Sequence, residues 1–244
     1  MTEIPHLQVD SDTGISNLTE TDFVRMSATS GTPWRHVFKD IQMPEAVSGL
    51  RILDIGAGTS DAVAKLLSLG ADAYALDPVY HYISHHDPKM LQDSVRKNFV
   101  NKLRNYPDLF KEAAGALSRF SRSINENPDR YIDGYASQMA FPDNYFDIVY
   151  SGTAILIYQD IDMNILRSIV EECLRVTKPG GSIRLYPFMQ SSESHEQTVN
   201  SARLRNNDKL VEELTKNPRV VRMQKFDFST PIQQAITLVI HKAT

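Results

Sequence analysis

The chain has 244 residues, of which 41% are hydrophobic and 23% are charged, and its formal net charge is −4. This length suits one well-buried α/β domain with an appendage and is short for two full domains. The negative charge argues against nucleic acid as the main partner, because binding to phosphates needs a basic surface.

Cysteine content and hydropathy narrow the class of protein further. Cys173 is the only cysteine, which excludes an internal disulfide, and its surroundings V-E-E-C-L-R-V favour a buried core thiol. No apolar stretch approaches the roughly 18 residues that span a bilayer. The first residues lack the basic and apolar regions of a secretory signal. We therefore expect a cytoplasmic protein that does not enter a membrane.

The N-terminal part predicts an arm followed by helices. Residues 1–18 are polar, as is typical of a flexible arm. A first helix is expected near residues 19–26. A second should begin at T-P-W-R-H-V-F, with Thr32 capping it and Pro33 in the first helical position. Residues 19–48 are thus expected to form a helical cap on the main domain, which would span residues 19–244.

From Leu50 the pattern becomes strand, turn and helix. R-I-L-D-I predicts a buried strand, residues 61–69 a helix that stops at Gly70, and A-D-A-Y-A-L-D a second strand. This spacing indicates a parallel pair with a right-handed crossover. Residues 80–132 interrupt the alternation with helical patterns, near residues 92–104 and 109–120, and are expected to form a helical insertion.

The insertion is basic in an otherwise acidic chain. Between residues 89 and 122, eight basic residues stand against three acidic ones. This excess could attract an anionic substrate or carrier, or it could be a solvated helix face. The basic residues are Lys89, Arg96, Lys97, Lys102, Arg104, Lys111, Arg119 and Arg122.

The alternation then resumes to the end of the chain. We expect strands at residues 131–135 and 146–151, a helix at 164–176, a turn at K-P-G-G (178–181) and a strand at 182–187. A helix near Lys209–Leu214 precedes two strands, 219–226 and 234–241, with no helix between them. The predicted fold class is therefore α/β: a doubly wound, mostly parallel seven-stranded sheet with an antiparallel C-terminal hairpin, N-terminal helices and a helical insertion.

The turn D-I-G-A-G-T-S-D, residues 54–61, indicates the ligand. Gly56 and Gly58 match a dinucleotide fingerprint, but Asp61 stands at its third glycine, and Asp54 adds a second acid. Two acids beside a pyrophosphate are unfavourable, whereas they suit a ligand with an ammonium and a sulfonium, such as S-adenosylmethionine. Asp77 ends the next strand, where a carboxylate can accept hydrogen bonds from ribose hydroxyls. The plainer alternative is that Asp54 and Asp77 only stabilise turns.

Four motifs in order resemble the class I S-adenosylmethionine-dependent methyltransferases, specifically the methyltransferase type 11 family. They are L-D-I-G-A-G-T-S, A-L-D-P, A-S-Q-M-A-F-P-D-N-Y-F-D-I-V-Y-S and L-R-V-T-K-P-G-G-S. The resemblance implies S-adenosyl-L-methionine as the cofactor. It implies that Asp54 faces the methionine ammonium through water and that Asp77 binds the ribose. The other implied cofactor residues are Gly56, Ala57 and Gly58 in the turn, Pro78 and the backbone of Ala136 and Ser137 beside the adenine, and Ser151 beside the methionine portion.

Two positions depart from the family pattern. Ser60 replaces the family's third glycine. Tyr135 stands where the family often has an aspartate near the adenine amino group. Asp133 lies two residues earlier, on the same face of an extended strand, and could substitute.

The resemblance implies methyl transfer to a small molecule or short peptide, by in-line displacement at the cofactor methyl. A general base is needed only when the nucleophile arrives protonated. The candidates for catalytic residues are Tyr158 and His36, against the plainer interpretations of a core or rim tyrosine and a solvent-facing histidine. The rival functions are a non-catalytic, methyltransferase-like binding subunit and, more remotely, a nicotinamide oxidoreductase.

Two further expectations concern the surroundings of the site. His81 and His85 are spaced to bind a metal with Asp87 nearby, but no third ligand is evident, so we assign no metal. Residues 19–40 and the insertion emerge near the expected ligand crevice. We expect them to cover the cofactor and form most of the acceptor pocket, which suits an anionic acceptor if the basic face lines it.

Overall fold

The computed structural model describes residues 33–81, 107–152, 154–155, 162–188, 201–227 and 236–244. In this part of the chain, one sheet contains seven strands in the order β3-β2-β1-β4-β5-β7-β6. The strands are β1 (Arg51–Ile55), β2 (Asp72–Leu76), β3 (Tyr131–Ile132), β4 (Phe146–Gly152), β5 (Thr177–Phe188), β6 (Val220–Asp227) and β7 (Ile236–Lys242). Neighbouring strands from β3 to β5 are parallel, while β7 is antiparallel to both β5 and β6. The predicted fold class is confirmed.

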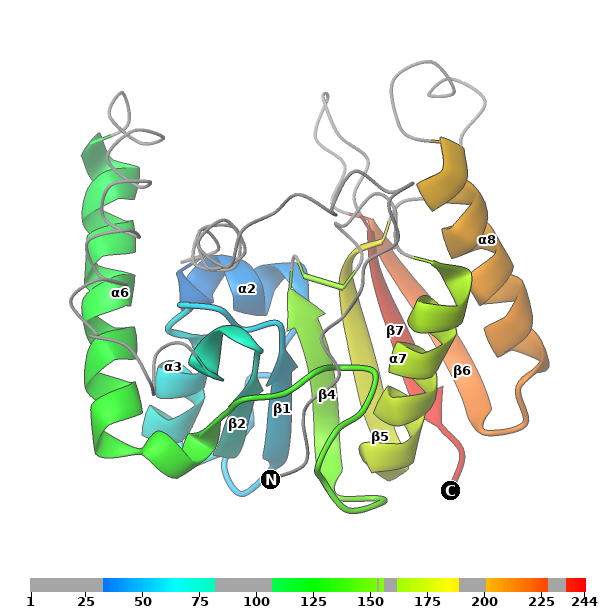
Figure 1. Ribbon diagram of the computed structural model, residues 1–244, viewed down its shortest axis with the longest axis horizontal. Helices are drawn as coiled ribbons and strands as arrows, with labels where there is room; N and C mark the ends of the chain where they lie inside the picture. Colours follow the sequence, from blue (N-terminus) through cyan, green and yellow to red (C-terminus); the bar gives the residue numbers. More distant parts are fainter. Residues whose placement is uncertain (1–32, 82–106, 153, 156–161, 189–200, 228–235) are drawn as a thin grey trace.

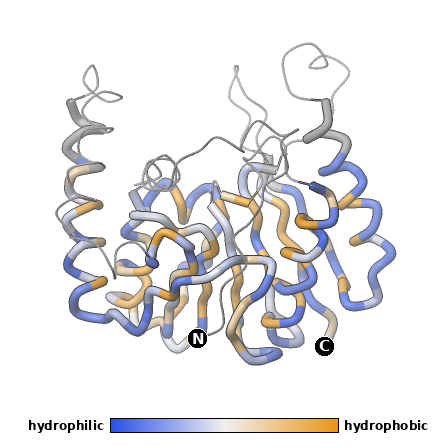
Figure 2. The backbone as a smooth tube through the Cα atoms, in the orientation of Figure 1, coloured by the Kyte–Doolittle hydropathy of each residue, from blue (hydrophilic) through white to orange (hydrophobic). Residues whose placement is uncertain are grey.

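Helices cover both faces of the sheet (Figure 1). On one face, α7 (Met163–Val176) and α8 (Ser201–Lys216) pack with β1, β4, β5 and β7 in a core that includes Leu53 and Val149. On the other face, α2 (Trp34–Asp40), α3 (Ala62–Ser68) and α6 (Pro107–Glu126) pack on Ile52 and Ile148. Adjacent residues of one strand thus enter opposite cores, as the two-residue period of a strand requires. Figure 2 shows the hydrophobic residues concentrated along these central strands.

Cys173 lies fully buried in the first core, on α7. Burial raises the pKa of its thiol to about 12, so the thiolate does not form near neutral pH. The sequence-based interpretation of a core thiol is confirmed. No helix in the described ranges is long and apolar enough to cross a membrane, and the cytoplasmic location stays a prediction.

Several element boundaries differ from the sequence-based expectations. Helix α2 begins at Trp34 with Pro33 as its N-cap, one residue later than predicted. The K-P-G-G motif is no turn between elements but a bulge inside β5: Thr177 pairs with Phe146 and Ser182 with Ile148, so residues 178–181 all stand opposite Asp147. Gly180 adopts a positive φ of 77°, which allows this excursion without steric cost.

The insertion is described only in part. Helix α6 and the short 3-10 helix η3 (Pro128–Arg130) belong to it, whereas residues 82–106 lie outside the described part. Phe120 of α6 stacks on Tyr80 at 6.4 Å between ring centroids, and Tyr131 packs edge-on against both rings. Aromatic contacts therefore hold α6 against β3 and against the segment that follows β2. The boundaries 80–132, the arm 1–18 and the cap 19–48 stay predictions.

Candidate functional site

The site lies where the strand order reverses. The chain leaves β1 through α3 to reach β2 on one side, while β4 pairs with β1 on the other side. In open α/β sheets, ligands bind at the carboxyl ends of the strands beside such a switch point. Helix α2 lies across this edge in Figure 1, and its Val37 would contact a Cβ placed on Gly152 at 3.4 Å. The carboxyl ends of β1, β2 and β4 therefore meet beneath α2.

The turn after β1 depends on its two glycines. Gly56 and Gly58 adopt φ values of 70° and 52°, in the left-handed region that other residues rarely occupy. A Cβ on Gly56 would lie 2.2 Å from the Cβ of Ala154, which follows β4. The carbonyl oxygen of Gly58 accepts a hydrogen bond from the Tyr80 hydroxyl at 2.9 Å. Because these two chain segments lie so close together, residue 56 must be glycine. The hydrogen bond from Tyr80 fixes the orientation of the peptide group at residue 58.

Asp77 is buried at the end of β2 and organises the same turn. Its two carboxylate oxygens accept one hydrogen bond each, from the Gly58 N–H at 2.9 Å and from the Val79 N–H at 2.8 Å. A carboxylate offers about four acceptor positions, so about two stay open for the paired hydroxyls of a ribose. Burial raises the pKa of Asp77 to about 6, although the two backbone donors oppose the shift.

Asp54 lies in β1 and is also buried. Its carboxylate accepts a hydrogen bond from the hydroxyl of the fully buried Tyr150 at 2.7 Å. Desolvation raises the pKa of Asp54 to about 7; the Tyr150 bond lowers it, and the charge of Asp77 raises it. Two carboxyl groups with raised pKa values at one sheet edge form a site whose negative charge a cationic ligand would stabilise.

Asp61 has a different role from the one that the sequence suggested. Its fully buried carboxylate accepts a hydrogen bond from the Trp34 N–H at 2.7 Å and pairs with the Arg119 guanidinium at 2.6 Å. Asp61 thereby fixes the first turn of α2 and the side of α6 to the start of α3. Each carboxylate oxygen of this residue, which stands at the third glycine position of the dinucleotide fingerprint, therefore already has a protein partner. Because Arg119 pairs with this carboxylate, Asp61 does not present an uncompensated negative charge to a ligand in the turn.

The segment after β3 forms a short turn beside Asp77. The Gln138 N–H donates to the Tyr135 carbonyl at 3.1 Å, so Ala136 and Ser137 occupy the two central positions of this turn. Ala136 is half-buried, and Ser137 and Tyr135 are exposed. Asp133, the predicted substitute for an aspartate at position 135, contacts His81 at 3.0 Å and raises the pKa of Asp77 by its charge.

The remaining cofactor candidates also lie at this edge. Ala57 is buried within the turn, and Pro78 is half-buried directly after Asp77. Ser151 is buried near the end of β4, and its hydroxyl oxygen accepts a hydrogen bond from the Ile155 N–H at 3.3 Å. The structure thus gathers the sequence-predicted positions from β1, β2, β4 and the segment after β3 at one edge. Their contacts with a cofactor stay predictions.

The catalytic candidates are only partly placed. His36 lies on α2 with about half of its side chain exposed, and its Nε2 is 3.7 Å from the carboxylate of Glu112 on α6. Tyr158 lies outside the described residues, as do His85 and Asp87. Among the described residues, no group of three potential metal ligands occurs. Tyr150 and Tyr80, which hold Asp54 and Gly58, were missed because the sequence alone gives no sign of a hydroxyl aimed across the sheet.

A methyltransferase domain profile matches residues 53–185, more than half of the chain, from β1 to the middle of β5. The chain belongs to this methyltransferase domain family. The match confirms the predicted resemblance to class I methyltransferases and the class of cofactor, S-adenosyl-L-methionine. The residues present fit this cofactor, because a glycine turn with positive φ lies between two buried carboxylates that keep open acceptor positions.

Individual relatives of this methyltransferase domain are distant. The ubiquinone/menaquinone biosynthesis C-methyltransferase UbiE of Shewanella sediminis is 28% identical over 61% of this chain. The aligned part spans 46% of that enzyme, so the chain covers about half the length of this curated relative. Among solved structures, the PH0226 protein of Pyrococcus horikoshii has a TM-score of 0.51 at 15% identity, with 93% of this chain and 100% of that chain covered. This likeness supports the fold alone.

Proposed function

We propose that this protein transfers a methyl group from S-adenosyl-L-methionine to a small molecule or short peptide. One observation carries the proposal: the buried carboxylates of Asp54 and Asp77 flank a glycine turn at the switch point of the sheet. When bound, the cofactor supplies an activated methyl group on a sulfonium, whose departure leaves a neutral thioether.

The chain's own residues would bind and orient the reactants. Asp54 faces the ammonium of the methionine portion, with its carboxylate fixed by Tyr150. The open acceptor positions of Asp77 receive the ribose hydroxyls. The turn formed by residues 135–138 meets the adenine edge with backbone groups, because it follows β3, which pairs with β2 directly before Asp77. Such fixed partners hold the methyl carbon in line with an incoming nucleophile, and this orientation supplies much of the rate acceleration.

The acceptor side has two candidate residues for catalysis. His36 on α2 and Tyr158 after β4 stay the candidates for removing a proton from the acceptor. Helix α2 crosses the carboxyl ends of the strands, and Asp61 fixes both α2 and α6 there. This arrangement supports the prediction that the N-terminal helices and the insertion surround the acceptor. An anionic acceptor fits this proposal if the basic residues of the insertion line the pocket.

The acceptor class can be tested by following the methyl group. Purified protein is incubated with S-adenosyl-L-methionine labelled in its methyl group and with a cell extract. The extract is then separated into small polar molecules, peptides, lipids, proteins and nucleic acids. We expect the label among the small molecules or short peptides, and much less of it with Asp77→Ala at the same subsaturating cofactor concentration. Label in lipid instead would replace the proposed acceptor with a lipid; the relative UbiE is named for quinone biosynthesis.

The alternative is a binding subunit that has the fold without turnover. It predicts that S-adenosyl-L-homocysteine binds with normal affinity while no fraction of the extract becomes labelled. If neither S-adenosyl-L-methionine nor its demethylated product binds, both the enzyme and the cofactor-binding subunit are excluded. Titration with NAD is the control, and tight NAD binding would support an oxidoreductase.

A further inference from the structure

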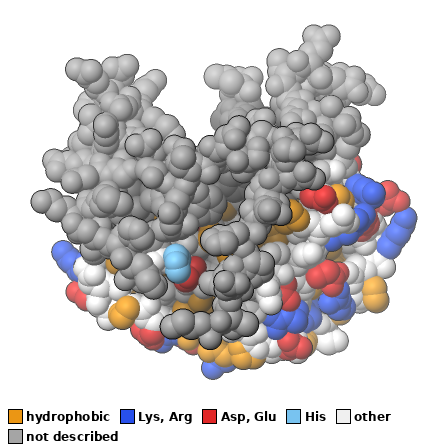
Figure 3. Space-filling view, in the orientation of Figure 1, with side chains coloured by type: hydrophobic (Ala, Val, Ile, Leu, Met, Phe, Trp, Pro, Cys, Tyr) orange, Lys and Arg blue, Asp and Glu red, His pale blue; other side chains and the backbone are white. Residues whose placement is uncertain are grey.

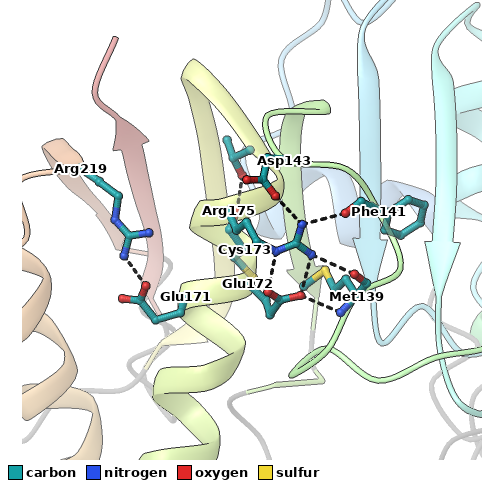
Figure 4. A network of polar contacts seen from close by, with 9 residues as sticks. Met139, Phe141, Asp143, Glu171, Glu172, Cys173, Arg175 and Arg219 are labelled. Carbon is teal, nitrogen blue, oxygen red and sulfur yellow. Dashed lines mark hydrogen bonds and ion pairs between the residues drawn. The ribbon is translucent and has the colours of Figure 1, made fainter.

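An arginine–glutamate pair on α7 holds the segment that follows the turn 135–138. Arg175 donates from Nε to one oxygen of Glu172 at 2.6 Å and from a terminal nitrogen to the other oxygen at 2.8 Å (Figure 4). The two residues are three apart on the helix, so both side chains leave the same face. This bidentate geometry leaves the other N–H groups of Arg175 free to point away from the helix axis.

Those N–H groups reach the backbone of the segment. Arg175 donates to the carbonyl oxygens of Met139 at 2.9 Å and Phe141 at 2.8 Å, and it pairs with Asp143 at 2.8 Å. Glu172 accepts from the Met139 N–H at 2.7 Å. Two helix side chains therefore bind three backbone groups of residues 139–141. These bonds fix the position and the orientation of the peptide groups at residue 139.

The turn itself is held from both ends. At its start, the Ile132 carbonyl accepts a hydrogen bond from the Asp77 N–H at 3.1 Å, and a Cβ on Gly134 would lie 2.9 Å from Leu76. At its end, Met139 is buried and bonded to both residues of the α7 pair. Between these anchors, Ala136 is half-buried and Ser137 is exposed, and neither has a long side chain. Their placement depends on the anchors at residues 132 and 139.

Adenine recognition requires such placement. The edge of adenine that a backbone can read has an amino donor next to a ring-nitrogen acceptor, and peptide groups match this pattern only in one relative position. We propose that Arg175 and Glu172 are positioning residues, which hold the turn 135–138 in the shape that recognises the adenine edge; this inference rests on the proposed function. Both side chains are charged at neutral pH, because the hydrogen bond from the Arg175 guanidinium lowers the pKa of Glu172.

The chain contains a matched control. Arg167, on the same helix, makes an equally bidentate pair with Glu213 of α8, at 2.9 and 2.6 Å. That pair joins two helices and touches no residue of the turn in the described structure. Both side chains of that pair are more than one third exposed. Acidic and basic side chains are interspersed over the described part of the face in Figure 3, as is typical of solvated surface pairs. Arg167→Ala therefore removes a comparable ion pair at a place where base recognition should not respond.

The experiment measures the ratio of two dissociation constants, for S-adenosyl-L-homocysteine and S-inosyl-L-homocysteine. In the inosine compound, a carbonyl oxygen replaces the amino group, so the donor becomes an acceptor. We expect the wild-type protein to prefer the adenosine compound by about tenfold or more, on the scale of a polar group left unpaired. In Arg175→Ala the ratio should fall to below about threefold, whereas Arg167→Ala should keep the wild-type ratio.

Each outcome decides something. If Arg175→Ala weakens both ligands equally and keeps the ratio, the pair has a structural role only and the inference is wrong. If the wild-type protein binds both compounds equally well, the turn does not read the base. If it binds neither, the proposed function fails and the inference fails with it. Should Arg175→Ala not fold, Glu172→Gln decides: it keeps the shape of the side chain, loses the charge, and should give an intermediate ratio.

Discussion

Cofactor affinity should rise steeply between pH 6 and pH 7, because two buried carboxyl groups must ionise to bind a cation and ribose hydroxyls. Burial raises the pKa of Asp54 to about 7 and that of Asp77 to about 6. The α-amino group of the ligand has a pKa of about 7.7–8.0, so it stays largely protonated over this window. The titration therefore reports on the protein's carboxyl groups.

The magnitude follows from the ionised fractions. With a pKa of about 7, the ionised fraction of Asp54 rises from roughly one eleventh at pH 6 to one half at pH 7, which is about fivefold. For Asp77, with a pKa of about 6, the same step gives about twofold. Together they predict an affinity gain of about tenfold, or about 1.4 kcal/mol.

Without ligand, the same shifts act in the opposite direction on stability. The pKa of Asp54 in the folded protein lies above its usual value of 3.8, so its contribution to the free energy of unfolding is fully present below about pH 4 and is lost as the pH rises through about 7. Asp54→Asn removes this ionisation. It should raise the Tm of the ligand-free protein relative to the wild type at pH 8 and raise it less at pH 5.

Isothermal titration calorimetry with S-adenosyl-L-homocysteine at pH 6.0, 6.5 and 7.0 measures the effect. Two buffers of different ionisation enthalpy also give the protons released on binding, which should be about 1.4 at pH 6, with about 0.9 from Asp54 and about 0.5 from Asp77. Asp54→Asn should retain only the roughly twofold dependence of Asp77. An affinity that is flat across this window, or an unchanged slope in Asp54→Asn, would refute the assignment of Asp54 to the ligand's cationic part.

Three other substitutions test separate parts of the site. Asp77→Ala should weaken cofactor binding by about 1–3 kcal/mol, measured by the same calorimetry. Asp72→Ala, at the other end of β2, is the control and should bind the cofactor as the wild type does. If Asp77→Ala and the wild type bind with equal affinity, Asp77 is not part of the site. Gly58→Val should abolish detectable binding, because a branched residue resists the φ of 52° found there; normal binding by a folded variant would contradict this turn geometry. Asp61→Ala should lower the free energy of unfolding by about 1–3 kcal/mol in urea titrations, because the Trp34 N–H at the start of α2 loses its hydrogen-bond partner. The ion pair with the half-exposed Arg119 adds little to this loss. An unchanged free energy of unfolding would mean that other contacts hold α2.

The sheet could be predicted because its signals are local. Each strand from β1 to β5 is a short apolar run between turn residues, and helical spacing separates most of these runs. The missing helix between β6 and β7 was enough to predict their antiparallel pairing. The bulge at K-P-G-G was not predictable, because a Pro-Gly-Gly sequence signals a turn whether it joins two elements or lies inside one. Only the pairing of Thr177 and Ser182 with β4 distinguishes these cases.

The candidate site shows a similar division. Asp54 and Asp77 could be found because each ends a predicted strand, and parallel strands bring such residues to one edge. The partners of Asp61 could not, because Trp34 and Arg119 lie 27 and 58 residues away in elements whose packing the sequence does not specify. The same holds for Tyr150, which is 96 residues from Asp54, and for the arginine of α7 that binds the turn after β3. The positions of these side chains therefore depend on polar contacts between residues that are far apart in the sequence.

The central claim is that the cofactor lies at the carboxyl ends of β1, β2 and β4, and a crystal structure of the full chain with S-adenosyl-L-homocysteine tests it most directly. We predict the ribose hydroxyls on the carboxylate of Asp77, the ammonium on the Asp54 side of the Gly56–Gly58 turn, and the adenine against the backbone of Ala136 and Ser137. A ligand bound elsewhere, or bound here with its ribose away from Asp77, would contradict the account.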